Sequence, residues 1–466
     1  MTKEKYPAKS HARSVSAHLF RLSSNFFGTT SPLFLLASPR TKYWPFCDQT
    51  QPFRQNRNFY YLTGCNLPDC YLTYDVADEK LILYLPEVDN DDVVWSGLPM
   101  SLDEAKAAFD VDDVRYAPQL IDELSTIASR IVFTVEDLSV EHELVVSAVN
   151  SKNISLKTAD PLFLEALEEA RLIKDEYELR LMRKASLISD NSHHKVMSTL
   201  LFSSNETHIH AEFVYHSLRA GSKNQSYDPI CCSGRSCSTL HYVKNDENLK
   251  GRQLVLLDAG AEWNNYASDV TRTFPISGVW TTEARQIYDL VLLMQRECCK
   301  RVAPGVNWEE LHLLAHKILI NGFLEIGIFR KEFTSEQILE SRISAAFLPH
   351  GLGHTLGMDT HDTGGRANYS DPDPLFRYLR IRRSLEAGMV VTVEPGCYFS
   401  PFVTDEWKTK ECWKIVDESV LDLYWDVGGV RIEDDVLVTV DGYENFTKIT
   451  KDPEEISKII IGNEIN

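Results

Sequence analysis

The stretch QLVLLDAGAEWNNYASDVTRTFPI, residues 253–276, constrains the fold more than any other part of the sequence. It contains an apolar run that ends in Asp258, two adjacent asparagines, and a second β-rich run that carries Asp269. Asn264 and Asn265 suit a two-residue hairpin turn because asparagine tolerates positive φ. Such a turn places both acids on one face of the hairpin as diagonal neighbours, about 7–8 Å apart at Cα. We therefore expect the two carboxylates to converge on one ion or on a close pair of ions.

Acids in apolar strands need a partner, because burying an unpaired carboxylate costs several kcal/mol. For Asp258 alone, a salt bridge to Arg272 is an equally good explanation. The pattern recurs, however: Glu394 follows the apolar run MVVTV, and Glu433 lies within GGVRIEDDVLVTV. Four acids in β-rich apolar surroundings are hard to explain as separate salt bridges, so the sequence favours a metal site.

The segment PHGLGHTLGMDTHD, residues 349–362, brings His350, His354 and His361 together with three glycines. A helix this rich in glycine would be poor, since each interior glycine costs about 1 kcal/mol relative to alanine. We expect a strand or loop whose backbone approaches a site closely. Carboxylates with an imidazole form a ligand set that suits Mn²⁺, Co²⁺ or Zn²⁺. Four carboxylates would balance two divalent cations, which can activate a bridging water and polarise a carbonyl. These residues favour a dinuclear hydrolase.

The N-terminal third predicts a domain in which strands alternate with helices. Short β-rich runs indicate strands at residues 33–38, 58–64, 70–76, 80–86 and 129–135. Residues 101–109 begin with Ser and have Glu three residues later, which is a capping-box signature. Apolar residues at helical spacing then predict a long helix over residues 160–197, so we place a domain boundary at residue 160. The expected domains are residues 1–160 and residues 161–466.

Composition excludes several classes of protein. A net charge of −20 disfavours a nucleic-acid binder, and the absence of a run of about 18 apolar residues argues against a membrane protein. The ten cysteines follow no secretory signal, so they predict reduced intracellular thiols. Residues 10–27 fit the first helix of the folded domain, which we favour, or a mitochondrial transit helix. We expect a cytoplasmic protein, with a mitochondrial location as the weaker alternative.

Four segments taken together resemble the metal-dependent Xaa-Pro peptidases of the pita-bread fold, prolidase and aminopeptidase P. They are DAGAEWNNYASDVTRTFP, PHGLGHTLGMDTHD, VVTVEPG and VRIEDDVLVT, and the resemblance begins at FRQNRNFYYLTG, residues 53–64. It implies an α+β or α/β chain with a creatinase-like N-terminal domain, a pita-bread catalytic domain and a homodimeric assembly. It also implies hydrolysis of small peptides with proline at the second position, as an Xaa-Pro aminopeptidase or an Xaa-Pro dipeptidase.

The resemblance also implies a set of metal ligands and a metal. The implied cofactor is a pair of divalent cations, with Mn²⁺ as the expected metal. Asp269 and Glu433 would bridge the two ions, Asp258 would bind one of them, and His354 and Glu394 would bind the other.

Further roles follow from the same resemblance. Glu394 would help to deprotonate the bridging water. His350 and His361 would donate hydrogen bonds to the substrate and to the reacting oxygens, or would instead hold the ligands in orientation. Tyr227 and Tyr266 fit a place beside the acids and core packing equally well.

Three residues are implied to bind substrate. His241 matches a histidine near the substrate, although a hydrogen-bonded strand histidine is the alternative. Arg380 matches an arginine that prolidases use for the C-terminal carboxylate, and a solvated basic face is the alternative. Arg431 would sit beside Glu433 and stabilise the charge of the site, unless it forms a purely structural ion pair.

Three other classes of protein share part of this pattern. Methionine aminopeptidase shares the ligand pattern but lacks the N-terminal domain, and creatinase shares both domains but uses no metal. Pita-bread domains also occur as non-catalytic binding modules for peptides, histones or RNA, but those have lost ligands that are all present here. The segment at residues 400–426 lies between two ligands, and it would shape either the cleft or a dimer contact.

Overall fold

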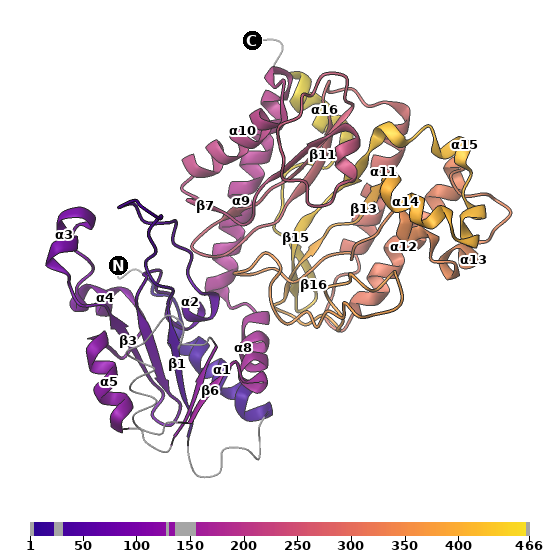
Figure 1. Cartoon of the computed structure of the whole chain (residues 1–466). Coiled ribbons are helices and arrows are strands. Elements are labelled where there is room, and N and C mark those ends of the chain that lie inside the picture. The colour runs from indigo at the N-terminus through magenta and orange to yellow at the C-terminus, as the bar shows by residue number, and fades with distance from the viewer. Residues whose placement is uncertain (1–3, 23–30, 127–129, 136–154, 463–466) are drawn as a thin grey trace. The chain divides into compact units, whose positions relative to one another are not determined.

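The computed structural model describes residues 4–22, 31–126, 130–135 and 155–462 (Figure 1). Contacts divide the chain into two compact units, Met1–Arg171 and Leu172–Asn466. Among the helices of the described ranges, none is both long enough and apolar enough to span a membrane.

The first unit is built on a six-stranded mixed sheet in the order β4-β3-β2-β1-β5-β6. The side chains of β1 pack on both faces of the sheet, because successive side chains of a strand point to opposite faces. Leu33 and Leu35 pack with α5 residues such as Leu120, whereas Phe34 packs against Phe163 of α8. The strands are β1 (Leu33–Ala37), β2 (Tyr71–Asp75), β3 (Lys80–Leu85), β4 (Asp113–Tyr116), β5 (Ile131–Thr134) and β6 (Ser155–Thr158). The helices are α1 (Ala8–Leu22), α2 (Arg57–Thr63), α3 (Asn90–Ser96), α4 (Leu102–Ala108), α5 (Ala117–Thr126) and α8 (Pro161–Leu172).

Most elements expected in the first unit are present. The strands expected near residues 33–38, 70–76, 80–86 and 129–135 are β1, β2, β3 and β5. The predicted capping box forms at the start of α4, where Ser101 and Glu104 bond reciprocally. The expected first helix is α1, which buries Ala12, Val15 and Leu19. The end of that predicted segment, residues 23–27, lies outside the described residues.

The strand predicted at residues 58–64 is wrong, because this segment forms the helix α2. The Asn56 side chain accepts a hydrogen bond from the Phe59 amide and caps the helix start. Gly64 ends the helix with φ of 67°, a left-handed conformation that glycine adopts readily. These two caps outweigh the β propensity of the aromatic residues between them.

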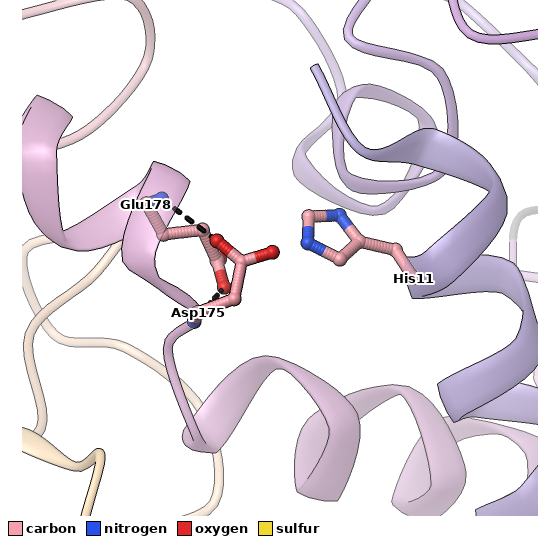
Figure 2. A group of neighbouring side chains, drawn as sticks. All are labelled: His11, Asp175 and Glu178. Atoms are coloured by element: carbon pink, nitrogen blue, oxygen red, sulfur yellow. Dashed lines mark hydrogen bonds between the residues drawn. The ribbon is translucent and has the colours of Figure 1, made fainter. Parts of the chain in front are cut away.

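The helix predicted over residues 160–197 is interrupted at residues 173–175, between α8 and α9 (Glu176–Thr199). Asp175 caps α9 and forms a capping box with Glu178 (Figure 2). Helix α8 belongs to the first unit, so the boundary follows Arg171 rather than residue 160. The reason is packing: Phe163 contacts Phe133, and the Tyr61 hydroxyl donates to the Ala170 carbonyl.

The second unit combines small antiparallel sheets with a helical shell around one hydrophobic core. Helix α11 packs on β12, β13 and β14, and α9 packs on β10. The strands are β7 (Asn224–Gln225), β8 (Ile230–Ser233), β9 (Leu254–Asp258), β10 (Ala261–Glu262), β11 (Thr271–Pro275), β12 (Val390–Val393), β13 (Gly396–Tyr398), β14 (Gly429–Arg431), β15 (Asp434–Thr439) and β16 (Gly442–Asn445). The other helices are α10 (Glu206–Arg219), α11 (Thr282–Cys299), α12 (Trp308–Ile326), α13 (Ser335–Glu340), α14 (Pro401–Lys408), α15 (Glu418–Leu421) and α16 (Pro453–Ile461).

A buried histidine of α12 makes the stability of the second unit sensitive to acid. His312 is fully buried, its Nε2 lies 2.6 Å from the Leu375 carbonyl, and burial lowers its pKa to about 4. The pKa of His312 is lower in the native state than in the unfolded chain. Its contribution to the free energy of unfolding is therefore complete above about pH 6.5 and is lost as the pH falls toward the native pKa. We expect a loss of up to about 2 kcal/mol at about pH 5 from this group.

Thermal unfolding at neutral and mildly acidic pH measures this effect. His312→Gln should retain a donor to Leu375 and show a smaller decrease in melting temperature on acidification than the wild type. His208, which is exposed, provides the control substitution His208→Gln. Equal pH dependence in wild type and His312→Gln would contradict the expectation.

Candidate metal centre

The predicted asparagine hairpin forms and brings the first two acids together. Asn264 and Asn265 have φ values of 48° and 65°, and β9 and β11 pair in the register that this turn requires. Asp258 and Asp269 therefore share one face of the hairpin. The Tyr227 hydroxyl lies 2.5 Å from Oδ1 of each of them. One phenol within hydrogen-bond reach of both carboxylates shows that they converge.

The remaining predicted ligands join these two acids from other strands. Glu394 directly follows β12, and Glu433 lies between β14 and β15. The Nε2 atom of His354 lies 3.4 Å from an oxygen of Asp269, 3.4 Å from Glu394 and 4.0 Å from Glu433. Ligand atoms of Asp269, His354 and Glu433 could hold one metal ion together. The structure thus gathers all five side chains at one place.

His354 is oriented as a ligand would be. Its Nδ1 lies 3.0 Å from the Thr355 carbonyl and donates to it, which leaves the Nε2 lone pair directed at the acids. The glycines of this segment permit close packing: a Cβ at Gly353 would lie 2.0 Å from the Thr392 carbonyl oxygen. The Thr392 hydroxyl also accepts from the His354 amide. The glycines are thus required by the backbone contacts that place His354.

Burial and mutual repulsion make the carboxylates of the site costly to ionise. Burial, reinforced by the charge of Asp258, raises the pKa of Asp269 well above its usual value. Burial and the neighbouring Asp269 likewise raise the pKa of Glu433, and burial raises the pKa of Glu394 to about 7. Crowded carboxylates of this kind are stabilised in their ionised form by a bound cation. This oxygen-rich set with one imidazole fits divalent metals.

Arg431 lies within the acidic cluster and pairs with Asp258. Its guanidinium lies 2.5 Å from Asp258, 2.9 Å from the Tyr398 hydroxyl and 3.1 Å from the Thr271 hydroxyl. It was expected beside Glu433, and the link to that residue runs through Thr271, whose hydroxyl donates to Glu433 at 2.6 Å. Arg431 therefore forms an ion pair and also faces the site.

The salt bridge considered between Asp258 and Arg272 is wrong. Arg272 is fully buried and pairs with Asp434 at 2.7 Å. The two residues lie on paired strands, but Arg272 is opposite Leu257 and so points to the other face from Asp258.

All of the predicted site residues line one cleft of about 480 Å³. The predicted residues among its walls are His241, Asp258, Asp269, His350, His354, His361, Arg380, Glu394, Arg431 and Glu433. Both ring nitrogens of His350 are engaged, by the Tyr398 hydroxyl at 2.8 Å and the Gly351 carbonyl at 2.7 Å. The His361 ring packs edge-on against His354 with centroids 4.4 Å apart.

Several residues of the site were not found from the sequence. Tyr398 contacts both His350 and Arg431, and the cleft wall includes Tyr369 and Tyr378. The sequence contains one signal for Tyr398, namely Gly396 two residues before it. A Cβ at Gly396 would lie 2.3 Å from the Tyr398 hydroxyl, so the position requires glycine.

The structure decides between the two roles considered for each tyrosine, and for the 400–426 segment it bears only on the cleft. Tyr227 lies beside the acids, whereas Tyr266 is buried and donates to Glu178 on α9 at 2.9 Å. Residues 400–426 contribute no side chain to the described cleft lining. They bury Trp407 and Trp413 in the core of the second unit instead.

A pita-bread unit with four converging acids and one imidazole defines a metallohydrolase, and comparison with known families agrees. Residues 180–440 match the model of metallopeptidase family M24, and residues 12–133 match the aminopeptidase P N-terminal domain. The chain belongs to metallopeptidase family M24, and its peptidase chemistry depends on divalent metal. The predicted two-domain fold is thereby confirmed.

Relatives match over nearly the whole chain. An uncharacterized peptidase of Saccharomyces cerevisiae is 49% identical over 460 residues, covering 98% of this chain and 84% of the relative. A probable Xaa-Pro aminopeptidase of Fusarium vanettenii is 47% identical over 463 residues, covering 98% and 97%. Pseudomonas aeruginosa aminopeptidase PepP has a TM-score of 0.81 at 28% identity, with 100% of both chains covered. Escherichia coli aminopeptidase P with the inhibitor Pro-Leu has a TM-score of 0.81 at 26% identity, covering 99% of this chain and 100% of that one.

Proposed function

We propose that this chain hydrolyses Xaa-Pro peptide bonds and releases the N-terminal residue that precedes proline. The observation that carries the proposal is the convergence of His354 with four acids in one cleft. Relatives described as probable Xaa-Pro aminopeptidases support the choice of bond, as does the Pro-Leu complex of the E. coli enzyme. A non-catalytic binding module is not favoured, because a binding module has no use for a complete ligand set.

We assign the ligands of two divalent cations, with Mn²⁺ as the proposed metal. Asp258, Asp269, His354, Glu394 and Glu433 would together hold this pair. When bound, such a pair supplies a water of lowered pKa and polarises the scissile carbonyl.

The other residues orient the substrate and move protons. Glu394 is placed to accept the proton of the attacking water, since its carboxylate borders both the cleft and His354. His361 faces the cleft, and its ring has no hydrogen-bond partner among the described residues, so it is available to the substrate. His350 holds Tyr398 and through it Arg431, which supports an orienting role. His241 also lines the cleft, where we propose that it contacts the substrate.

Arg380 is proposed to bind the substrate's C-terminal carboxylate. The cleft has two arginines, and Arg431 is already bonded to Asp258. In the part of the chain that the structure describes, Arg380 has no carboxylate partner and bonds only to the Tyr369 hydroxyl. A guanidinium in this state suits a bidentate contact with a carboxylate. The proposed substrates are therefore small peptides with proline second, and Xaa-Pro dipeptides above longer ones.

The direct test compares Ala-Pro with Ala-Ala as substrates. An Xaa-Pro bond is a tertiary amide that lacks the N–H on which general peptidases rely. We expect Ala-Pro to be cleaved and Ala-Ala to be cleaved far more slowly. Chelation by EDTA should abolish the activity, and added Mn²⁺ should restore it. Full activity after removal of all metal, or equal rates on both dipeptides, would contradict the proposal.

We also propose a homodimer in the cytoplasm. All ten cysteines are free thiols, which supports a reducing compartment. The homodimer rests on the family resemblance, and light scattering of the purified chain would test it.

A further inference from the structure

A loop between His361 and Ser384 places two half-exposed tyrosines beside the cleft. Tyr369 and Tyr378 line it, and Arg380 follows shortly after. The Nη1 atom of Arg380 donates to the Tyr369 hydroxyl at 3.1 Å. The Tyr369 side chain is not needed for the core, because the residue is 56% exposed. Core packing therefore gives no reason for a tyrosine at this position.

The turn that carries this tyrosine is held at two points. Asp371 accepts from Arg382 at 2.9 Å, and Asp373 pairs with Arg342 at 2.9 Å. Both ion pairs are only partly exposed, with each side chain at or below 36%. These ion pairs anchor the turn close to Tyr369, which lines the cleft.

The backbone of Arg380 is also fixed, so only its side chain is left to be placed. A Cβ at Gly365 would lie 2.4 Å from the Arg380 carbonyl oxygen, and the Arg382 amide donates to the Gly365 carbonyl at 2.8 Å. A long arginine side chain has many rotamers to lose on binding. The bond to Tyr369 selects one of them before the substrate arrives.

We infer that Tyr369 is a positioning residue for recognition of the substrate's C-terminal carboxylate. It holds the Arg380 guanidinium toward the cleft and leaves the remaining N–H groups to pair with the carboxylate. This inference rests on the proposed function, and it makes Tyr369 a determinant of preference for peptides that end in proline.

The substitution Tyr369→Phe removes the phenol oxygen and leaves the ring. Kinetics are measured with Ala-Pro and with Ala-Pro amide, which lacks the carboxylate charge. We expect KM for Ala-Pro to rise roughly fivefold, the scale of one lost hydrogen bond, with kcat unchanged. Both constants for the amide should stay at the wild-type values. A merely structural role would change both substrates alike.

Two further variants make the result decisive. Tyr215→Phe is the matched control, because Arg219 donates to the Tyr215 hydroxyl at 2.7 Å on the exposed surface of α10; it should change neither substrate. Arg380→Ala should raise KM for Ala-Pro, and adding Tyr369→Phe to it should have no further effect.

Each outcome supports or overturns the inference. It is overturned if Arg380→Ala affects Ala-Pro while Tyr369→Phe does not, and the proposed carboxylate contact then still stands. If neither variant affects Ala-Pro, the proposed Arg380 contact fails and the inference with it, while hydrolysis of the Xaa-Pro bond still stands. If the wild type cleaves neither substrate, the proposed function itself fails. An equal effect of Tyr369→Phe on both substrates also overturns it.

Discussion

Replacing Asp269 by Asn is expected to reduce kcat for Ala-Pro by at least about a hundredfold, because removing even an outer partner of a metal site costs 10–100-fold. Asp269 is 5% exposed, lies 3.4 Å from the His354 Nε2 and shares the Tyr227 hydroxyl with Asp258. The amide keeps the shape of the side chain but loses the charge of a proposed metal ligand. Steady-state kinetics at saturating Mn²⁺ measure the effect.

The control for this variant is Asp405→Asn. That carboxylate is 66% exposed and pairs with Lys408 on α14, so its loss should leave kcat unchanged. Circular dichroism should show that both variants are folded. Wild-type turnover by Asp269→Asn would show that the reacting centre lies elsewhere.

Replacing Arg272 by Met is expected to destabilise the second unit by about 3–5 kcal/mol, the usual cost of breaking a buried ion pair. Arg272 and Asp434 have fully buried side chains. The guanidinium also donates to the backbone carbonyls of Glu433 and Ile449. Methionine would leave those acceptors unsatisfied beneath the site. Urea unfolding of the metal-free protein measures the change.

The matched control is Arg235→Met. Arg235 and Asp426 form the same kind of pair at 2.8 Å, but both side chains are 67% exposed. Exposed pairs contribute only about 0–1 kcal/mol. If the two variants lost equal stability, burial would not be the source of the Arg272 effect.

The fold was predictable wherever local signals agreed with one another. The short β-rich runs predicted β1, β2 and β3, and the Ser101–Glu104 pair marked the start of α4. The prediction failed at α2, where aromatic composition favoured a strand while Asn56 and Gly64 act as helix caps. The break before α9 could also have been read from the capping pair of Asp175 and Glu178, which the apolar periodicity concealed.

The acids of the site could be placed from the sequence, but their partners could not. The asparagine turn fixes strand register, and register alone sets Asp258 beside Asp269. The partners of buried arginines depend on how separate sheets pack, which no local pattern encodes. Arg431 therefore pairs with Asp258, and Arg272 pairs with Asp434, each far away in the sequence.

Metal content per chain is the most direct measurement on the proposed site. Asp258, Asp269, His354, Glu394 and Glu433 are proposed to retain two divalent cations together. Wild-type protein loaded with Mn²⁺ and dialysed should contain two metal ions per chain by elemental mass spectrometry, and Glu433→Gln should contain fewer. A wild-type chain that retains no metal, or a Glu433→Gln variant with the full wild-type content, would show that these residues do not form the metal site.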